Sequence, residues 1–191
     1  MLTTLTLFPI VAALLLVLTP NDKEKLIYSL NIALSLVPLV MLLMAGPLFS
    51  PPEQVLSLLE SKEWIPQIGA SYCLGLDGIN LPFLGMLTFL AVIASLVPPL
   101  PGENLKKRSI LLLLWEATLI GAFLAQDYVL FLVFWAAGTA PLYFLLKPSL
   151  ESPPMPAARC YVLSTLLSIV ALGSGLLILT TSLNTTAFAS D

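Results

Sequence analysis

The chain has 191 residues, of which 58% are hydrophobic and 10% charged, with a formal net charge of -3. This composition lies outside the range of a soluble domain, predicts an all-α integral membrane protein in the lipid bilayer, and gives no indication of a nucleic-acid partner. With two cysteines and no histidine, the chain cannot assemble a disulfide framework or a zinc, haem or iron–sulfur site, so we expect no metal or cofactor and place any redox centre in a partner.

Six apolar runs predict six transmembrane helices, because each is long enough to cross a bilayer core of about 30 Å at about 1.5 Å per residue. The first run has no basic segment before it and is expected to stay as a helix instead of being removed as a signal peptide. The second contains Pro38, which predicts a helix kink. The expected spans are approximately residues 2–18, 26–45, 81–97, 110–125, 128–146 and 160–179, in a single membrane domain of residues 1–191.

One long connection, residues 47–80, separates the second span from the third. Its first half sets apolar side chains against charged ones, which predicts a short amphipathic helix lying at the membrane interface. We expect Trp64 and Tyr72 to act as interfacial anchors and Asn80 to cap the third helix with its side chain. The amphipathic prediction rests on Val55, Leu56, Leu58 and Leu59 against Glu53, Glu60 and Lys62.

The basic residues predict an orientation, because lysine and arginine favour the cytoplasmic side of short loops. With six spans, all but one of them fall on one side, whereas the acidic long connection and both termini fall on the other. Both termini are therefore expected on the extracytoplasmic or lumenal side. The residues on the shared side are Lys23, Lys25, Lys106, Lys107, Arg108, Lys147 and Arg159, and Lys62 is the exception.

Glu116 is the strongest candidate for a functional residue. It lies about midway along the span 110–125, where a charge costs roughly 2.5 kcal/mol or more to insert. A carboxyl group at this depth can remain protonated or pair with a lysine of another helix, and either arrangement suits a proton relay. The alternative is a neutral Glu116 that is hydrogen-bonded to a neighbouring backbone group or hydroxyl.

Small residues recur within three spans and predict close helix packing; a water-filled channel between the helices is the alternative. Pro141 predicts a kink in the fifth span, the alternative being a broken helix that offers carbonyl groups to an ion. Asp77 and Asp127 lie at membrane boundaries and are expected to be solvated helix caps. The small residues are Ala117, Gly121 and Ala125 in the fourth span, Ala136, Ala137, Gly138 and Ala140 in the fifth, and Gly173, Ser174 and Gly175 in the sixth.

Three segments are distinctive in their sequence, order and spacing. They are LGLDGINLP at residues 74–82, LLLLWEATLIGAFLAQDYVLFLVFW at 111–135 and APLYFLL at 140–146. They resemble the antiporter-like membrane subunits of respiratory complex I, in the chain 4 branch that includes photosynthetic relatives. The resemblance runs from about Trp64 onward and corresponds to the first six helices of such a subunit. It implies a membrane-arm subunit of an NAD(P)H- or ferredoxin:quinone oxidoreductase, beside other membrane subunits, in a bacterial inner membrane or a thylakoid membrane.

The chain departs from that family where the resemblance implies proton transfer. The family carries a glutamate directly after an aromatic pair in its fifth helix, and this glutamate works with a lysine two helices later. Here Phe134 and Trp135 are followed by Ala136, and the chain stops before the lysine-bearing helix. Glu116 matches an acidic position in the fourth helix of many relatives.

The departures favour a degenerate, accessory or structural subunit over a proton pump acting by itself. Two alternatives remain open. The chain could form half of a split proton-translocating subunit, with a second polypeptide supplying the other helices, or it could work as a small stand-alone ion carrier.

Overall fold

The computed structural model describes residues 1–45, 58–66, 69–99, 103–146 and 156–183, and it is mostly helical. The predicted helices are present, and most of their ends lie within a few residues of the predicted ones, since proline, glycine or polar loops stop each apolar run. A two-stranded hairpin is added to them. The elements are α1 (Leu2–Leu18), α2 (Glu24–Ala45), β1 (Leu58–Ile65), β2 (Ala70–Leu76), α3 (Asn80–Leu96), α4 (Leu105–Leu124), α5 (Tyr128–Leu146) and α6 (Pro156–Leu183).

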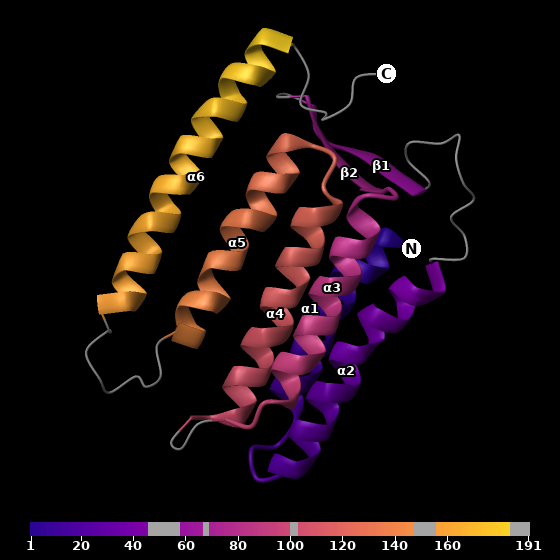
Figure 1. The fold of residues 1–191 in the computed structure, drawn as a ribbon, viewed down its shortest axis with the longest axis vertical. Coiled ribbons are helices and arrows are strands. Elements are labelled where there is room, and N and C mark those ends of the chain that lie inside the picture. Colours follow the sequence, from indigo (N-terminus) through magenta and orange to yellow (C-terminus); the bar gives the residue numbers. More distant parts are fainter. Residues whose placement is uncertain (46–57, 67–68, 100–102, 147–155, 184–191) are drawn as a thin grey trace.

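Helix α4 is the centre of the bundle. It packs against α1, α2, α3 and α5 and touches β2, whereas α6 lies at the edge alongside α5 (Figure 1). The β1–β2 hairpin crosses the end of the bundle where α1 begins, and the starts of α2, α4 and α6 lie at the opposite end (Figure 1). Residues on α4 are therefore the ones most enclosed by other helices.

Three helices within the described residues are long and apolar enough to cross a membrane: α2 over Glu24–Met44, α5 over Tyr128–Leu146 and α6 over Arg159–Thr180. Helices α1 and α3 are apolar but only 17 residues long. Helix α4 has 20 residues and starts near Asn104, whose side chain accepts a hydrogen bond from the Lys107 amide. Its first turn is basic, and this turn was predicted as loop.

The hairpin corrects the all-α expectation and the predicted amphipathic helix. Residues 58–62 belong to strand β1, which pairs antiparallel with β2 in the register Leu58↔Leu76 and Glu60↔Leu74. Strand β2 in turn bridges Ala125, and the Gln126 amide donates to the Cys73 carbonyl (2.8 Å). Distant backbone pairing therefore prevails over a local helical pattern. The remaining residues of that pattern, Glu53, Val55 and Leu56, lie outside the described residues.

The two predicted interfacial aromatics have different surroundings. Trp64 on β1 is 43% exposed, as expected of an anchor at an interface. Tyr72 on β2 is partly buried and packs against the core cluster that contains Leu74 and Leu124. Tyr72 thus contributes to holding the hairpin on the bundle.

Helix α3 begins at Asn80, one residue before the predicted span, and Asp77 supplies the cap in place of the predicted Asn80. The Asp77 carboxylate accepts hydrogen bonds from the amides of Ile79 (2.9 Å) and Asn80 (2.6 Å). The Asn80 side chain returns a bond by accepting from the Asp77 amide (2.9 Å), and its amide group donates to the Gly75 carbonyl (3.1 Å). This reciprocal arrangement satisfies groups at the helix start that would otherwise be unpaired.

Two basic residues at the start of α4 bind the ends of neighbouring helices. Lys106 Nζ donates to the carbonyls of Val17 (2.9 Å) and Thr19 (2.7 Å) at the end of α1. Arg108 donates to the carbonyls of Ala94 and Val97 at the end of α3. Cations at helix C-termini satisfy free carbonyl groups and interact favourably with the helix dipole.

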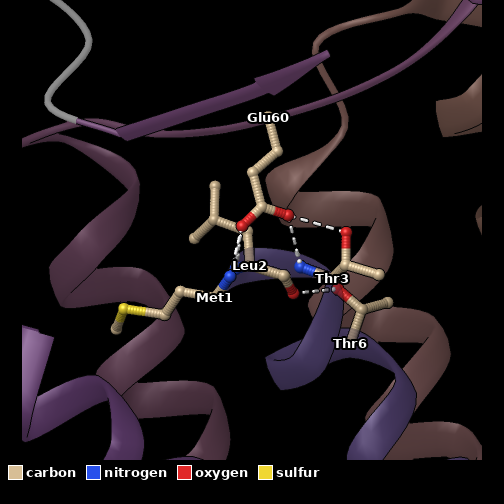
Figure 2. A network of polar contacts seen from close by, with 5 residues as sticks. All are labelled: Met1, Leu2, Thr3, Thr6 and Glu60. Atoms are coloured by element: carbon tan, nitrogen blue, oxygen red, sulfur yellow. Dashed lines mark hydrogen bonds and ion pairs between the residues drawn. The ribbon is translucent and has the colours of Figure 1, made fainter. Parts of the chain in front are cut away.

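Glu60 fastens the hairpin to the start of α1 (Figure 2). Its carboxylate accepts hydrogen bonds from the amides of Leu2 (2.9 Å) and Thr3 (2.9 Å), from the Thr3 hydroxyl (2.7 Å) and from the amine of Met1. Partial burial acts to raise the pKa of this carboxyl, but the bonds from the amine, Thr3 and Leu2 lower it from 4.5 to about 2. An acidic side chain at a helix N-terminus is favourable on both counts.

We expect Glu60→Gln to loosen the hairpin at neutral pH, because the amide side chain loses the charge and one acceptor. Hydrogen–deuterium exchange should speed up at the Leu2 and Thr3 amides and in residues 58–65. In the native chain the contribution of Glu60 is present above a pH of about 4.5 and is lost as the pH falls toward about 2, since the pKa is lowered on folding. Glu63→Gln is the matched control, because Glu63 is exposed on the same strand; equal exchange in both variants would contradict the role of Glu60.

Candidate functional site

Glu116 lies on α4 and is 1% exposed. It borders a cavity of about 10 Å³ between α2, α3 and α4. Two alanines of α3, Ala91 and Ala94, line the cavity. The other lining residues are Asn31 and Ser35 of α2, Ser95 of α3, and Leu112, Leu113 and Trp115 of α4.

The polar side chains around this cavity are only partly satisfied. Ser35 Oγ and Ser95 Oγ are 3.1 Å apart and bond to each other and to the carbonyls of Ile32 and Val92. In contrast, Glu116 Oε1 and Asn31 Oδ1 are buried without a hydrogen-bond partner in the part of the chain that the structure describes. The site therefore has buried acceptor atoms with unused capacity.

No ion pair of Glu116 occurs among the described residues. Along α4, Lys106 and Arg108 direct their donors to carbonyl groups at the ends of α1 and α3, and Lys107 Nζ lies 5.7 Å from the centre of the Phe144 ring. A carboxyl group without a cationic partner can exchange a proton but cannot hand it to a lysine within this part of the chain. The site thus offers one titratable group in the interior of the bundle.

Two of the small residues, Gly121 of α4 and Gly138 of α5, lie where these two helices meet. Gly121 faces the ring of Phe134, and Gly138 faces the Thr118 hydroxyl. Ala117 is fully buried and Ala125 is 7% exposed, while Ala136 is half-buried on α5. On α6, Gly173 lies near Leu132, but an added methyl at Gly175 would meet nothing within 4 Å.

The two prolines that predict helix kinks lie inside continuous helices. Helix α2 runs through Pro38 and α5 runs through Pro141, and α1 also contains Pro9. Pro141 is buried, which places its ring against neighbouring side chains instead of an aqueous path. The kinks at Pro38 and Pro141 stay predictions.

Asp127 corrects the expectation of a solvated cap. It does cap α5, since its carboxylate accepts from the amides of Val129 (2.8 Å) and Leu130 (3.2 Å). However, the residue is 0% exposed, and its second oxygen accepts from the Ser71 amide (3.1 Å) of β2. Burial raises the pKa of the Cys73 thiol, and the negative charge of the nearby Asp127 raises it further. A hydrogen bond with Ser61 lowers this pKa and offsets only part of the rise.

The polar residues around Glu116 also escaped the sequence analysis. Asn31 and Ser35 are four residues apart and so share one face of α2, and Ser95 is a further polar side chain inside an apolar span. Polar residues at helical spacing within an apolar run are the signal that could have found them. Asp127 has no comparable local signal, because its burial comes from the hairpin.

We expect Gly121→Ala to destabilise the contact between α4 and α5, because an added methyl carbon would lie 2.7 Å from Cγ of Phe134. Because Cγ is the ring atom nearest the backbone, Phe134 and its helix would have to move to make room, which typically costs about 1–3 kcal/mol. Gly175→Ala is the matched control, since that methyl has open space and alanine favours the helix. Thermal melting in detergent should show a lower midpoint for Gly121→Ala alone, and equal midpoints would contradict this contact.

The chain is similar to known proteins along nearly all of its length. It is 32% identical to NAD(P)H-quinone oxidoreductase chain 4 of the chloroplast of Chlorokybus atmophyticus over 178 residues, which are 92% of this chain and 35% of that protein. No protein-family profile matches the chain.

Solved structures show the same fold. A chain of respiratory complex I from Thermus thermophilus superposes with a TM-score of 0.78 at 24% identity, covering 98% of this chain and 38% of that one. A chain of the Mrp complex from Dietzia superposes with a TM-score of 0.68 at 20% identity, covering 97% of this chain and 20% of that one. The sequence thus spans about a third of the curated relative it matches, and the chain is homologous to that part of the NAD(P)H-quinone oxidoreductase chain 4 protein. It shares its fold with the matched part of the complex I chain.

Proposed function

We propose that this chain is a membrane-arm subunit of a complex I-like NAD(P)H- or ferredoxin:quinone oxidoreductase, and that its role is accessory or structural. The homology to chain 4 proteins over 92% of the chain supports the assignment to such an assembly. The observation that carries the accessory role is Ala136, which follows Phe134 and Trp135 where the family resemblance implies a glutamate.

The proposal includes six membrane-spanning helices in a single membrane domain of residues 1–191. Helices α1 and α3, with 17 residues each, reach about 26 Å at about 1.5 Å per residue, close to the thickness of a bilayer core. Many apolar side chains on the outside of the bundle are exposed, as expected where lipid covers the surface. Such a protein is integral to a bacterial inner membrane or a thylakoid membrane.

The charges support a lumenal or extracytoplasmic position for the hairpin and both termini. Lys23, Lys25, Lys106, Lys107 and Arg108 lie on turns or helix starts at the end of the bundle opposite the hairpin (Figure 1). Basic residues favour the cytoplasmic side, which in a thylakoid is the stromal side. Lys147 lies outside the described residues.

An accessory role follows from the chemistry of the interior. A proton relay needs groups that can pass a proton on, and the described part of α5 offers a methyl group at Ala136. Glu116 has no ion-pair partner among the described residues. One carboxyl group can hold a proton without forming a path across the bundle.

Helix α6 favours one alternative, in which the chain is half of a split proton-translocating subunit. None of the apolar window in Arg159–Thr180 is buried within this chain, although its mean hydropathy of 2.3 is the highest of the three candidate spans. Further helices supplied by a second polypeptide would cover it. The stand-alone ion carrier gains no comparable support from the described residues.

We expect purification of the native membrane complex through this chain, in mild detergent, to recover complex I-type subunits. Mass spectrometry should find full-length antiporter-like chains among them. Recovery of one further polypeptide in fixed ratio, carrying a lysine in an apolar span, would favour the split subunit. Recovery of the chain by itself, with ion transport in liposomes, would favour the stand-alone carrier and contradict the proposal.

We expect Glu116→Gln to leave proton translocation per electron within about twofold of native, since an accessory subunit carries no obligatory proton step. The measurement is proton uptake by vesicles that contain the complex, with assembly checked on native gels. Removal of the whole chain should instead lower the amount of assembled complex. Loss of translocation in an assembled Glu116→Gln complex would overturn the accessory role.

A further inference from the structure

We propose that a single water molecule occupies the cavity between α2, α3 and α4 and bridges the side chains of Glu116 and Asn31. This site goes beyond the proposed function, because it depends on the interior of the bundle and not on the partners of the subunit. This water molecule would link α2 and α4 through a water-mediated polar contact.

The first argument is the chemistry of the two unpaired atoms. Asn31 Oδ1 and Glu116 Oε1 border the same cavity and have no hydrogen-bond partner among the described residues. Their residues are 3% and 1% exposed, so bulk water does not satisfy them. An amide oxygen is an acceptor, and so is a carboxyl oxygen that carries no proton, and a buried acceptor left unpaired costs about 1–3 kcal/mol.

The second argument is that the neighbouring hydroxyls cannot supply the missing donors. A serine hydroxyl has one proton. The proton of Ser95 is directed to the Val92 carbonyl (2.7 Å), and that of Ser35 to the Ile32 carbonyl or to Ser95 Oγ (both 3.1 Å). A water molecule, in contrast, has two O–H donors, one for each of the two unpaired atoms.

The third argument is size. The cavity measures about 10 Å³, which is close to the smallest volume that holds one water molecule and too small for two. Four side chains around it carry oxygen atoms: Asn31, Ser35, Ser95 and Glu116. Divalent cations of the Mg²⁺ or Ca²⁺ type take six or more oxygen ligands, so the cavity fits water better than a cation.

A double-mutant cycle on the full chain in its native complex tests the bridge. Asn31→Leu fills the cavity and leaves Glu116 without a donor, and Glu116→Met leaves Asn31 without one. We expect each single variant to lower the melting midpoint of the chain by roughly 4–8 °C. The double variant removes both acceptors, so its midpoint should fall by clearly less than the sum of the two single shifts.

Thr88→Val, combined with Glu116→Met, is the control pair. Thr88 is also fully buried on α3, but its hydroxyl already donates to the Leu84 carbonyl (2.9 Å) and the residue does not line the cavity. The shifts of this pair should add. Additive shifts for Asn31 and Glu116 as well would overturn the bridge.

Cryo-electron microscopy of the unmodified complex gives a test that needs no variant. One density peak within hydrogen-bonding distance of Asn31 Oδ1 and Glu116 Oε1 is expected, and a map with well-resolved waters elsewhere but none here would overturn the proposal. The melting midpoint should also be the same in sodium chloride and choline chloride. A sodium-dependent rise that Glu116→Met abolishes would overturn water in favour of a bound cation.

Discussion

Polar groups at helix ends must find partners when helices pack in apolar surroundings, and this constraint shapes the whole structure. Charged side chains, some next to the helix start and others distant in sequence, accept from or donate to these groups and carry the charge that the helix end favours. Glu60, Asp77 and Asp127 accept from free amides at the starts of α1, α3 and α5. Lys106 and Arg108 donate to free carbonyls at the ends of α1 and α3. Anions at helix starts and cations at helix ends both interact favourably with the helix dipole.

The same constraint explains why the hairpin belongs to the bundle and is not an appendage. Glu60 joins β1 to α1, and Asp127 joins β2 to α5. The backbone of β2 also pairs with the connection between α4 and α5 through Leu74 and Cys73. The hairpin therefore holds three helices in register at one end, and Lys106 and Arg108 tie α4 to α1 and α3 at the other.

The sequence was sufficient for the helices because each apolar run is long and ends at proline, glycine or charged residues. It was insufficient for residues 58–76, since a five-residue pattern around Leu58 and Glu60 fits a helix and a strand about equally well. The choice depends on pairing with β2, which follows directly along the chain, and on the contact of β2 with Ala125, which is distant in sequence. Glu116 was evident as a lone carboxyl group in an apolar run, whereas the burial of Asp127 depends on the hairpin and left no local sign.

Glu116 and Ala136 lead to opposite expectations, and the packing of α4 reconciles them. Ala136 removes the carboxyl group that the family resemblance assigns to proton transfer, yet Glu116 is still buried at the centre of the bundle. A buried carboxyl group is costly to keep unless its surroundings satisfy it. In the proposed arrangement, the water molecule beside Glu116 also satisfies Asn31, whose Oδ1 otherwise has no partner among the described residues. Such a water-mediated contact would be a sufficient physical reason for Glu116 in the accessory role proposed for this subunit.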